Sequence, residues 1–290
     1  MDNGAVEPMT TPGLHRFAIL VALFALLLIV AGAWLSSEVL PLPGSAPAAA
    51  AATTDAWTSL AKVHRILGDT TGTLTIALAI WLTIAGGPRR HIGWAAVIVV
   101  VAEAFLGIPA ALQAFPRALG IVHALLAPIY FALLAAIVIF TSRRFIAGPE
   151  LVDDKFGTLR KLSLWLVAFV LLQIALGASY RYNALGVIWH ILNAMVVLVL
   201  LLVVGVVTLK QFPAHRALRP AAHSLLGIGG VQVLLGFATF LVLLMVSQNT
   251  PALVYVSVAH IAFGAITLAA AVAMAIQIRY NVRATTVSNT

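Results

Sequence analysis

The chain has 290 residues, of which 62% are hydrophobic and only 9% are charged, and its mean hydropathy is +1.07. A water-soluble domain cannot carry so apolar a composition on its surface, so the composition excludes a soluble enzyme or binding domain and predicts an integral membrane protein. The formal net charge is +8, and the absence of cysteine excludes disulfides and thiolate chemistry.

Eight apolar runs are long enough to cross a bilayer as helices, which takes about 20 residues each. In chain order they cover 15–37, 62–85, 92–115, 119–141, 161–180, 185–209, 221–247 and 252–278. No small-residue cleavage site follows the first run, so we interpret it as a spanning helix and not as a removed signal peptide. The sequence therefore predicts an all-α, polytopic membrane protein.

The distribution of lysine and arginine predicts the orientation of these helices. If the N-terminus is cytoplasmic, thirteen of the 17 basic residues fall on the cytoplasmic side. The other four are Lys62, Arg65, Arg117 and Arg181. This asymmetry obeys the positive-inside rule and places both termini on the cytoplasmic side of a bacterial-type cytoplasmic membrane. The basic charge is then explained by contact with membrane lipid, and nucleic-acid binding is not expected.

Two connecting segments between the predicted helices are long. The outer segment 38–58 is rich in proline and alanine and is expected to be irregular, whereas the inner segment 142–161 is charged and lies midway along the chain. The second is expected to link an N-terminal half, 1–141, to a C-terminal half, 162–290. Because each half holds four helices, an even number, both enter the membrane in the same direction. The expected architecture is thus two four-helix bundles related as a parallel repeat.

A short motif recurs near the outer ends of the odd-numbered helices. A polar residue precedes a glycine by four positions in "EAFLG" at 103–107, "QIALG" at 173–177 and "QVLLG" at 232–236, while the first helix has only "LIVAG" at 28–32. Ordinary helix packing explains any single copy, since glycine permits close approach and glutamine bonds across helices. Three copies on odd-numbered helices favour duplication of a four-helix unit.

The eight histidines fall into two sets. His15, His91, His215 and His223 lie at or near the cytoplasmic side, where a solvated or interfacial role is expected. The other four lie near the outer end of each even-numbered helix: His64, His123, His190 and His260. An ionisable group inside a membrane is costly and by default marks a functional site, although a lone histidine can also serve as an interhelical hydrogen-bonding group.

Small residues follow each of these four histidines by one helical turn. They are Gly68, Ala127, Ala194 and Gly264, which lie on the same helical face as the histidine. Such positions leave room for a flat macrocycle lying below its ligand. Small residues are also common in membrane helices, so the pattern supports a ligand site without identifying one.

Two kinds of metal site agree with four buried histidines. A closed tetrahedral zinc site could use all four, but a parallel repeat holds its equivalent residues apart. Two bis-histidine haem sites agree better, because neutral imidazole in an apolar four-helix interior commonly holds haem iron. His64 with His123 would hold one haem and His190 with His260 the other, both near the outer face.

Three outer arginines could pair with the propionates of these haems. Arg65 follows a candidate ligand directly and Arg181 ends one copy of the repeat motif, so we expect both to bind propionates. For Arg117, propionate pairing and snorkelling to lipid headgroups both stay open.

The eight helices, their duplication, the histidines, "LQIALGASYR" at 172–181 and the His64–Arg65 pair together resemble the haem A synthase family of cytochrome oxidase assembly factors. The resemblance covers nearly the whole chain. It implies oxidation of haem O to haem A, through successive hydroxylation of the C8 methyl to a formyl group. It also implies that His64 and His123 bind the substrate haem, while His190 and His260 hold a haem b cofactor that passes electrons. A haem O synthase and a terminal oxidase are the implied partners; the electron donor stays open.

The chain departs from the family pattern beside its first histidine. The family has a glutamate three residues before this histidine, next to the substrate porphyrin, and here that position is Ala61. The cysteine pair found in some members is also missing. Glu103 replaces the glutamine of the repeat motif and is a weak candidate for the missing acid, either as a proton or haem-substituent contact or as a carboxyl bonded within the bundle.

Three functional classes therefore remain open. The first is a haem A synthase. The second is a di-haem b protein of the same fold that handles haem or electrons without hydroxylation, and it is motivated by Ala61. The third is a transporter built from parallel repeats, which rests on fold analogy alone.

Overall fold

A computed structural model describes residues 12–40, 55–86, 89–111, 117–142, 151–153, 159–246 and 250–284. Its helices are α1 (Pro12–Val39), α2 (Asp55–Ile84), α3 (Arg90–Ala111), α4 (Arg117–Thr141), α5 (Leu159–Arg181), α6 (Val187–Gln211), α7 (Leu218–Met245) and α8 (Pro251–Asn281). Two three-residue strands, β1 (Leu151–Asp153) and β2 (Val282–Ala284), complete the described elements.

The helices have the length and composition of membrane spans. Within the described ranges, 8 helices are long and apolar enough to cross a membrane. The prediction of a polytopic all-α membrane protein is confirmed. Helix α2 begins at Asp55 and not at residue 62, and α1 continues to Val39, so both helices extend into the segment expected to be irregular. The rest of that segment, 41–54, lies outside the described residues.

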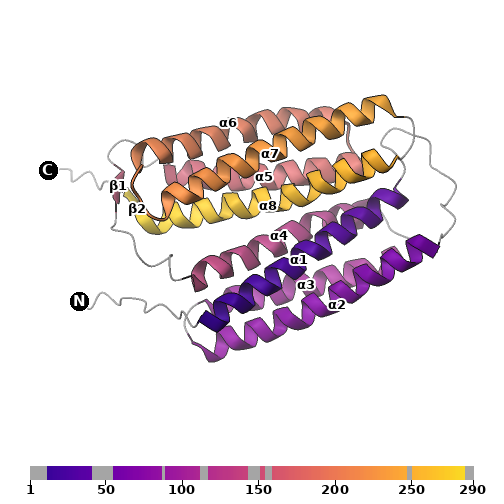
Figure 1. Cartoon of the computed structure of the whole chain (residues 1–290), viewed down its shortest axis with the longest axis horizontal. Helices are drawn as coiled ribbons and strands as arrows, with labels where there is room; N and C mark the ends of the chain where they lie inside the picture. Colours follow the sequence, from indigo (N-terminus) through magenta and orange to yellow (C-terminus); the bar gives the residue numbers. More distant parts are fainter. Residues whose placement is uncertain are drawn as a thin grey trace.

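The helices pack as two groups of four (Figure 1). Within α1–α4 and within α5–α8, each helix contacts the next one, and the fourth contacts the first. Each group has its own apolar core, with Leu14, Leu78 and Leu134 fully buried in the first and Leu166 and Leu225 in the second. The same closed arrangement thus occurs in each half of the chain.

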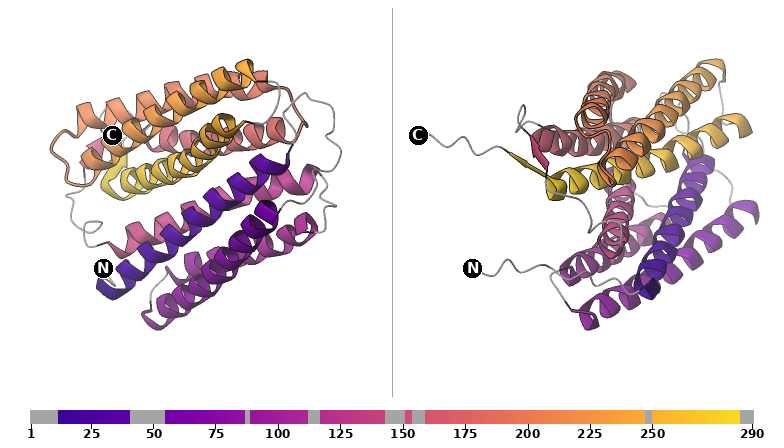
Figure 2. Two further views of the ribbon diagram at one scale, coloured as in Figure 1. Left: turned by 45° about the vertical axis from the view of Figure 1, so that its right-hand side comes forward. Right: turned by 60° about the vertical axis from the view of Figure 1, so that its left-hand side comes forward.

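The two groups meet along α1, α4, α5 and α8 (Figures 1 and 2). The contacts are α4 with α8, α1 with α8 and α4 with α5. Replacing each helix by its equivalent in the other group converts the α1–α8 contact into the α5–α4 contact and leaves α4–α8 unchanged, as a pseudo-twofold axis requires. Ala132 of α4 packs in the second core, and Ala269 of α8 packs in the first. Each follows the histidine of its own helix by nine residues.

The two strands connect the segment between the halves to the end of α8. They pair in parallel, with Leu151 aligned with Val282 and Asp153 with Ala284. They lie at the end of the bundle where α1 begins and α8 ends (Figure 1). The linker expected at 142–161 therefore contains a short strand, and α5 begins within it at Leu159. Its residues 143–150 and 154–158 lie outside the described ranges.

Local hydrogen bonds explain where the last two helices begin. At α8, Thr250 Oγ1 accepts a hydrogen bond from the Leu253 amide at 3.3 Å, and Pro251 occupies the first turn. At α7, the ring of His215 performs the capping role, because its Nδ1 accepts from the amides of Ala217 and Leu218 at 3.2 and 3.1 Å. His215 is therefore a buried capping residue and not a solvated one.

Candidate functional site

The four histidines singled out in the sequence lie at one end of the bundle. Each stands within the first three turns of its helix: His64 in α2, His123 in α4, His190 in α6 and His260 in α8. These four helices begin at the same end of the molecule, opposite the start of α1 (Figure 1). The four histidines, which occupy matching positions in the repeat, therefore lie at about the same depth in the bundle.

Glycine on the preceding helix makes room for three of the four rings. A Cβ added at Gly177 would stand 2.9 Å from Cε1 of His190, and this distance recurs between Gly32 and His64 and between Gly236 and His260. Real Cβ atoms essentially never approach so closely. The glycine of the repeat motif is therefore required by the histidine ring that packs on it. Gly107 differs, since nothing lies within 4 Å of its added Cβ.

The residue four positions before each of these glycines presents its backbone carbonyl to the ring. His190 Nδ1 lies 3.1 Å from the Gln173 carbonyl oxygen. The equivalent carbonyls of Leu28 and Gln232 lie near the rings of His64 and His260. The Nδ1 atoms of these two rings are buried and make no hydrogen bond of good geometry within the described residues. When Nδ1–H donates to a carbonyl, Nε2 keeps its lone pair, which is the arrangement of metal-binding histidines.

The structure brings the histidines of the second half into ring contact, and those of the first half into electrostatic range. The ring centroids of His190 and His260 are 6.3 Å apart and their planes are inclined at 81°. His64 and His123 are close enough to interact electrostatically. No group of three or more His, Asp or Glu side chains that could hold a metal ion occurs in the described part of the chain. The four histidines therefore do not form one tetrahedral site.

The geometry of the His190–His260 pair can be compared with that of a metal held between two imidazoles. A ligating nitrogen lies about 2 Å from the metal and about 1 Å from its own ring centroid, so two imidazoles on opposite sides of one ion have centroids about 6 Å apart. The separation of 6.3 Å fits this requirement. Two neighbouring histidines between apolar helices would also supply the donor set that haem iron accepts. His190 and His260 would thus fit a haem as its holding residues.

A polar network that sequence reasoning missed surrounds His190. Buried Asn193 of α6 donates to Gln173 Oε1 at 2.7 Å and to the Phe169 carbonyl at 3.1 Å. Its bond to Gln173 directs the amide nitrogen of that side chain toward His190, 3.1 Å from both ring nitrogens. The Gln173 amide must therefore move away before Nε2 of His190 can bind a metal. The sequence contained one indication of this network, which is the position of an asparagine, Asn193, three residues after His190 in an otherwise apolar helix.

In the first half, a carboxylate replaces the amide. His123 Nδ1 lies 2.6 Å from Glu103 Oε2, and Glu103 is buried. Its other oxygen, Oε1, has no hydrogen-bond partner among the described residues. The structure therefore places Glu103 on the candidate ligand itself.

The small residues after the histidines have different neighbours. A Cβ added at Gly264 would stand 3.4 Å from the amide nitrogen of Gln232, so the Gln232 side chain uses this clearance. At Gly68 the nearest atom is Cδ1 of Leu28 at 3.9 Å, and space remains. The space one turn after His64, at Gly68, is therefore open. The space one turn after His260, at Gly264, is partly filled by the Gln232 side chain.

The three outer arginines have unequal environments. Arg181 ends α5 and donates from Nη2 to the Ser36 carbonyl of α1 at 3.2 Å, across the boundary between the halves. Its Nε is buried and has no hydrogen-bond partner among the described residues, so it can donate to an anion. Arg65 is exposed. Arg117 is also exposed and donates weakly to the Asn183 carbonyl at 3.4 Å.

Tyr182 strengthens the same boundary beside Arg181. Its ring packs on Gly120 of α4, where an added Cβ would overlap the ring. Burial raises the pKa of the Tyr182 phenol, while the positive charge of Arg181 opposes this rise. The phenol is therefore neutral at physiological pH.

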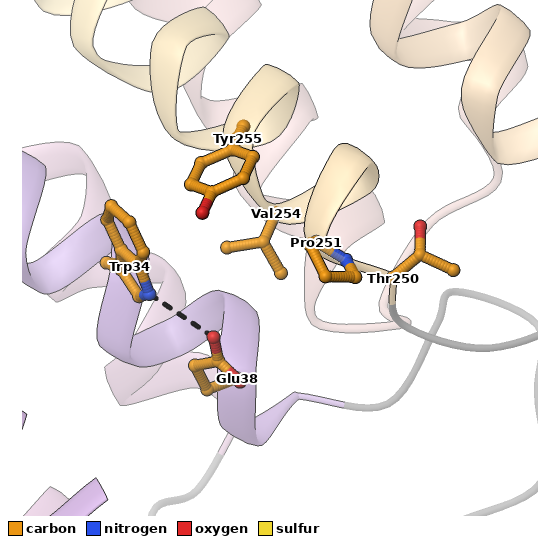
Figure 3. Close-up of a pocket in the computed structure, with 6 residues that line it drawn as sticks. All are labelled: Trp34, Glu38, Thr250, Pro251, Val254 and Tyr255. Carbon is orange, nitrogen blue, oxygen red and sulfur yellow. Dashed lines mark hydrogen bonds between the residues drawn. The ribbon is translucent and has the colours of Figure 1, made fainter. Parts of the chain in front are cut away.

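A separate cavity of about 210 Å³ lies between α1 and α8 (Figure 3). Its lining residues are Trp34, Glu38, Thr250, Pro251, Val254 and Tyr255. Trp34 Nε1 donates to Glu38 Oε1 at 3.2 Å, and the Trp34 and Tyr255 rings meet edge to face at 5.4 Å. The four histidines are not among the lining residues, so this cavity is distinct from the histidine sites.

Ala61 occupies the position before His64 where the resembled family has its glutamate. It is half-buried, and α2 continues through it without interruption. Its methyl group cannot accept or donate a proton. Glu103, the candidate for the missing acid, contacts His123, the other candidate ligand of this half.

Comparison with known proteins adds no relative: no protein-family model matches the chain, and no curated protein does either.

Proposed function

We propose that this chain is a membrane haem protein of the haem A synthase type, with one haem site in each four-helix half. The observation that supports this most is the His190–His260 pair, whose centroid separation of 6.3 Å matches two imidazoles on one iron. His190 and His260 hold a haem b cofactor. His64 and His123 hold the substrate, haem O, which is oxidised at its C8 methyl to the formyl of haem A.

The roles of the protein groups follow from their contacts. The Gln173 carbonyl fixes Nδ1 of His190, so that Nε2 is the ligating atom. The buried Nε of Arg181 is available to a haem propionate, and Arg65 would pair with one from the exposed side. Haem supplies one-electron and oxygen chemistry when it is bound.

The same proposal includes the orientation of the chain in the membrane and the proteins with which it works. Both termini face the cytoplasm, as the distribution of lysine and arginine favours, and the haem sites lie near the outer face. A haem O synthase supplies the substrate, and a terminal oxidase receives the product.

A second candidate is favoured by Ala61. A di-haem b protein for electron transfer or haem handling needs the four histidines but no carboxylate beside the substrate porphyrin. It would have the same helices, histidine pairs and arginines as the synthase. Only the reaction distinguishes the two candidates.

Expression with a haem O source separates these candidates. The first predicts that cells making the wild-type chain accumulate haem A, detected by chromatography of extracted haems. The control is the His64→Ala variant, which should accumulate none. Persistent absence of haem A in wild type, together with its appearance in an Ala61→Glu variant, would overturn the first candidate in favour of the second.

A further inference from the structure

The two halves differ most sharply in the group that holds the histidine of their last helix. Glu103 on α3 and Gln232 on α7 occupy equivalent places, four residues before the motif glycine. Glu103 Oε2 lies 2.6 Å from His123 Nδ1. At the equivalent place in the second half, His260 Nδ1 and Gln232 Oε1 are both buried without a hydrogen-bond partner among the described residues, and the group of Gln232 nearest in effect to the ring is its neutral backbone carbonyl. The fold therefore gives one histidine a carboxylate partner and its counterpart a neutral one.

The position of the His123 ring agrees with this difference. The other three rings pack on their motif glycines at the same distance, whereas Gly107 has no atom near its added Cβ. His123 is thus held through Glu103 and not through a glycine contact. The carboxyl group is buried in an apolar helix bundle, where low dielectric strengthens its effect on the ring.

A carboxylate behind a histidine changes what that histidine does to a metal. By accepting the Nδ1–H bond it fixes the tautomer and makes Nε2 a stronger electron donor. A stronger donor stabilises ferric more than ferrous iron and so lowers the reduction potential, because axial ligands and hydrogen bonding around them set haem potentials. A neutral carbonyl that accepts the same bond lowers the reduction potential to a smaller extent.

We propose that Glu103 is a positioning residue that acts through His123, orienting this ligand and making the haem of the first half the lower-potential of the two. This inference rests on the proposed haem sites. It gives the buried acid a function different from that of the glutamate absent at Ala61, since Glu103 contacts the candidate ligand His123 itself.

The test is a redox titration of the full-length protein in detergent, with both sites filled by added hemin and the potentials followed by optical spectroscopy. The component lost in His123→Ala identifies the first site. In Glu103→Gln we expect the preference of that site for ferric iron to fall about tenfold, an upward shift of about 59 mV for one electron. Glu103→Asp should restore most of the wild-type value. The second component should stay unchanged in both variants.

Gln232→Glu is the matched control, because it places an acid at the equivalent position of the other half. It must leave the first component unchanged. Two bound haems with unaltered potentials in Glu103→Gln, or equal shifts of both components, would overturn the role of Glu103 while leaving the haem sites intact. A protein that binds no hemin would overturn the haem sites and this inference together.

Discussion

His190 of α6 and His260 of α8 lie edge to face, with ring centroids 6.3 Å apart and planes at 81°. They belong to helices that are not consecutive in the chain, and α7 lies between them in sequence. Each ring packs on a glycine of the preceding helix. This arrangement leaves Nε2 of His190 free of the backbone, because its Nδ1 meets the Gln173 carbonyl.

Replacing Gly177 by alanine should disturb the site. The new methyl would stand 2.9 Å from His190 Cε1, so the ring must shift, at a cost of about 1–3 kcal/mol for overpacking. We expect the purified Gly177→Ala protein to retain less haem in its second half, measured by haem content per chain.

Gly107→Ala is the matched control for that change. Nothing lies within 4 Å of the added methyl, and alanine favours a helix over glycine by roughly 1 kcal/mol. Unchanged haem content in both variants would show that the close contact between glycine and histidine has no functional consequence.

Asn193→Ala should loosen the orientation of Gln173. The variant loses the bonds to Gln173 Oε1 and to the Phe169 carbonyl, which costs about 1 kcal/mol in a membrane bundle. We expect a lower thermal unfolding midpoint and a changed potential of the second haem only. Leu67→Ala, at the equivalent position of α2, should leave that potential unchanged; an identical shift in both variants would contradict the role of Asn193.

Arg181→Gln should weaken haem retention about tenfold or more. The variant loses a charged donor whose Nε is buried and available to a propionate, and charge-assisted bonds contribute about 1.5–3 kcal/mol. Haem dissociation to an apo-haem scavenger measures the effect. Arg117→Gln removes an exposed charge and serves as the control. Equal dissociation rates in the wild type and in Arg181→Gln would contradict propionate binding by Arg181.

The helices and the histidine pattern could be predicted from the sequence because both depend on distances along one helix. Apolar runs of sufficient length gave the spans, and the spacing from the helix start put His64 and His260 at one depth. The motif glycine at 236 was visible as well. The reason for a glycine at this position could not be seen in the sequence, because it depends on which ring of the next helix packs there.

Contacts between helices could not be predicted from the sequence, because they depend on how each helix is rotated about its axis. The bond between Glu103 and His123 joins α3 to α4, and the bond between Asn193 and Gln173 joins α6 to α5. The capping role of His215 was likewise hidden, because it depends on the turn between α6 and α7. Polarity marked these residues as unusual without identifying their partners.

The haem content of the purified protein tests the central claim most directly. Reduced-minus-oxidised spectra and haem extraction from detergent-purified protein, supplied with hemin, should give two haems per chain with low-spin bis-histidine bands. His64→Ala and His260→Ala should each lose one haem and keep the other. A colourless protein, or haem binding that is unchanged in both variants, would contradict the account.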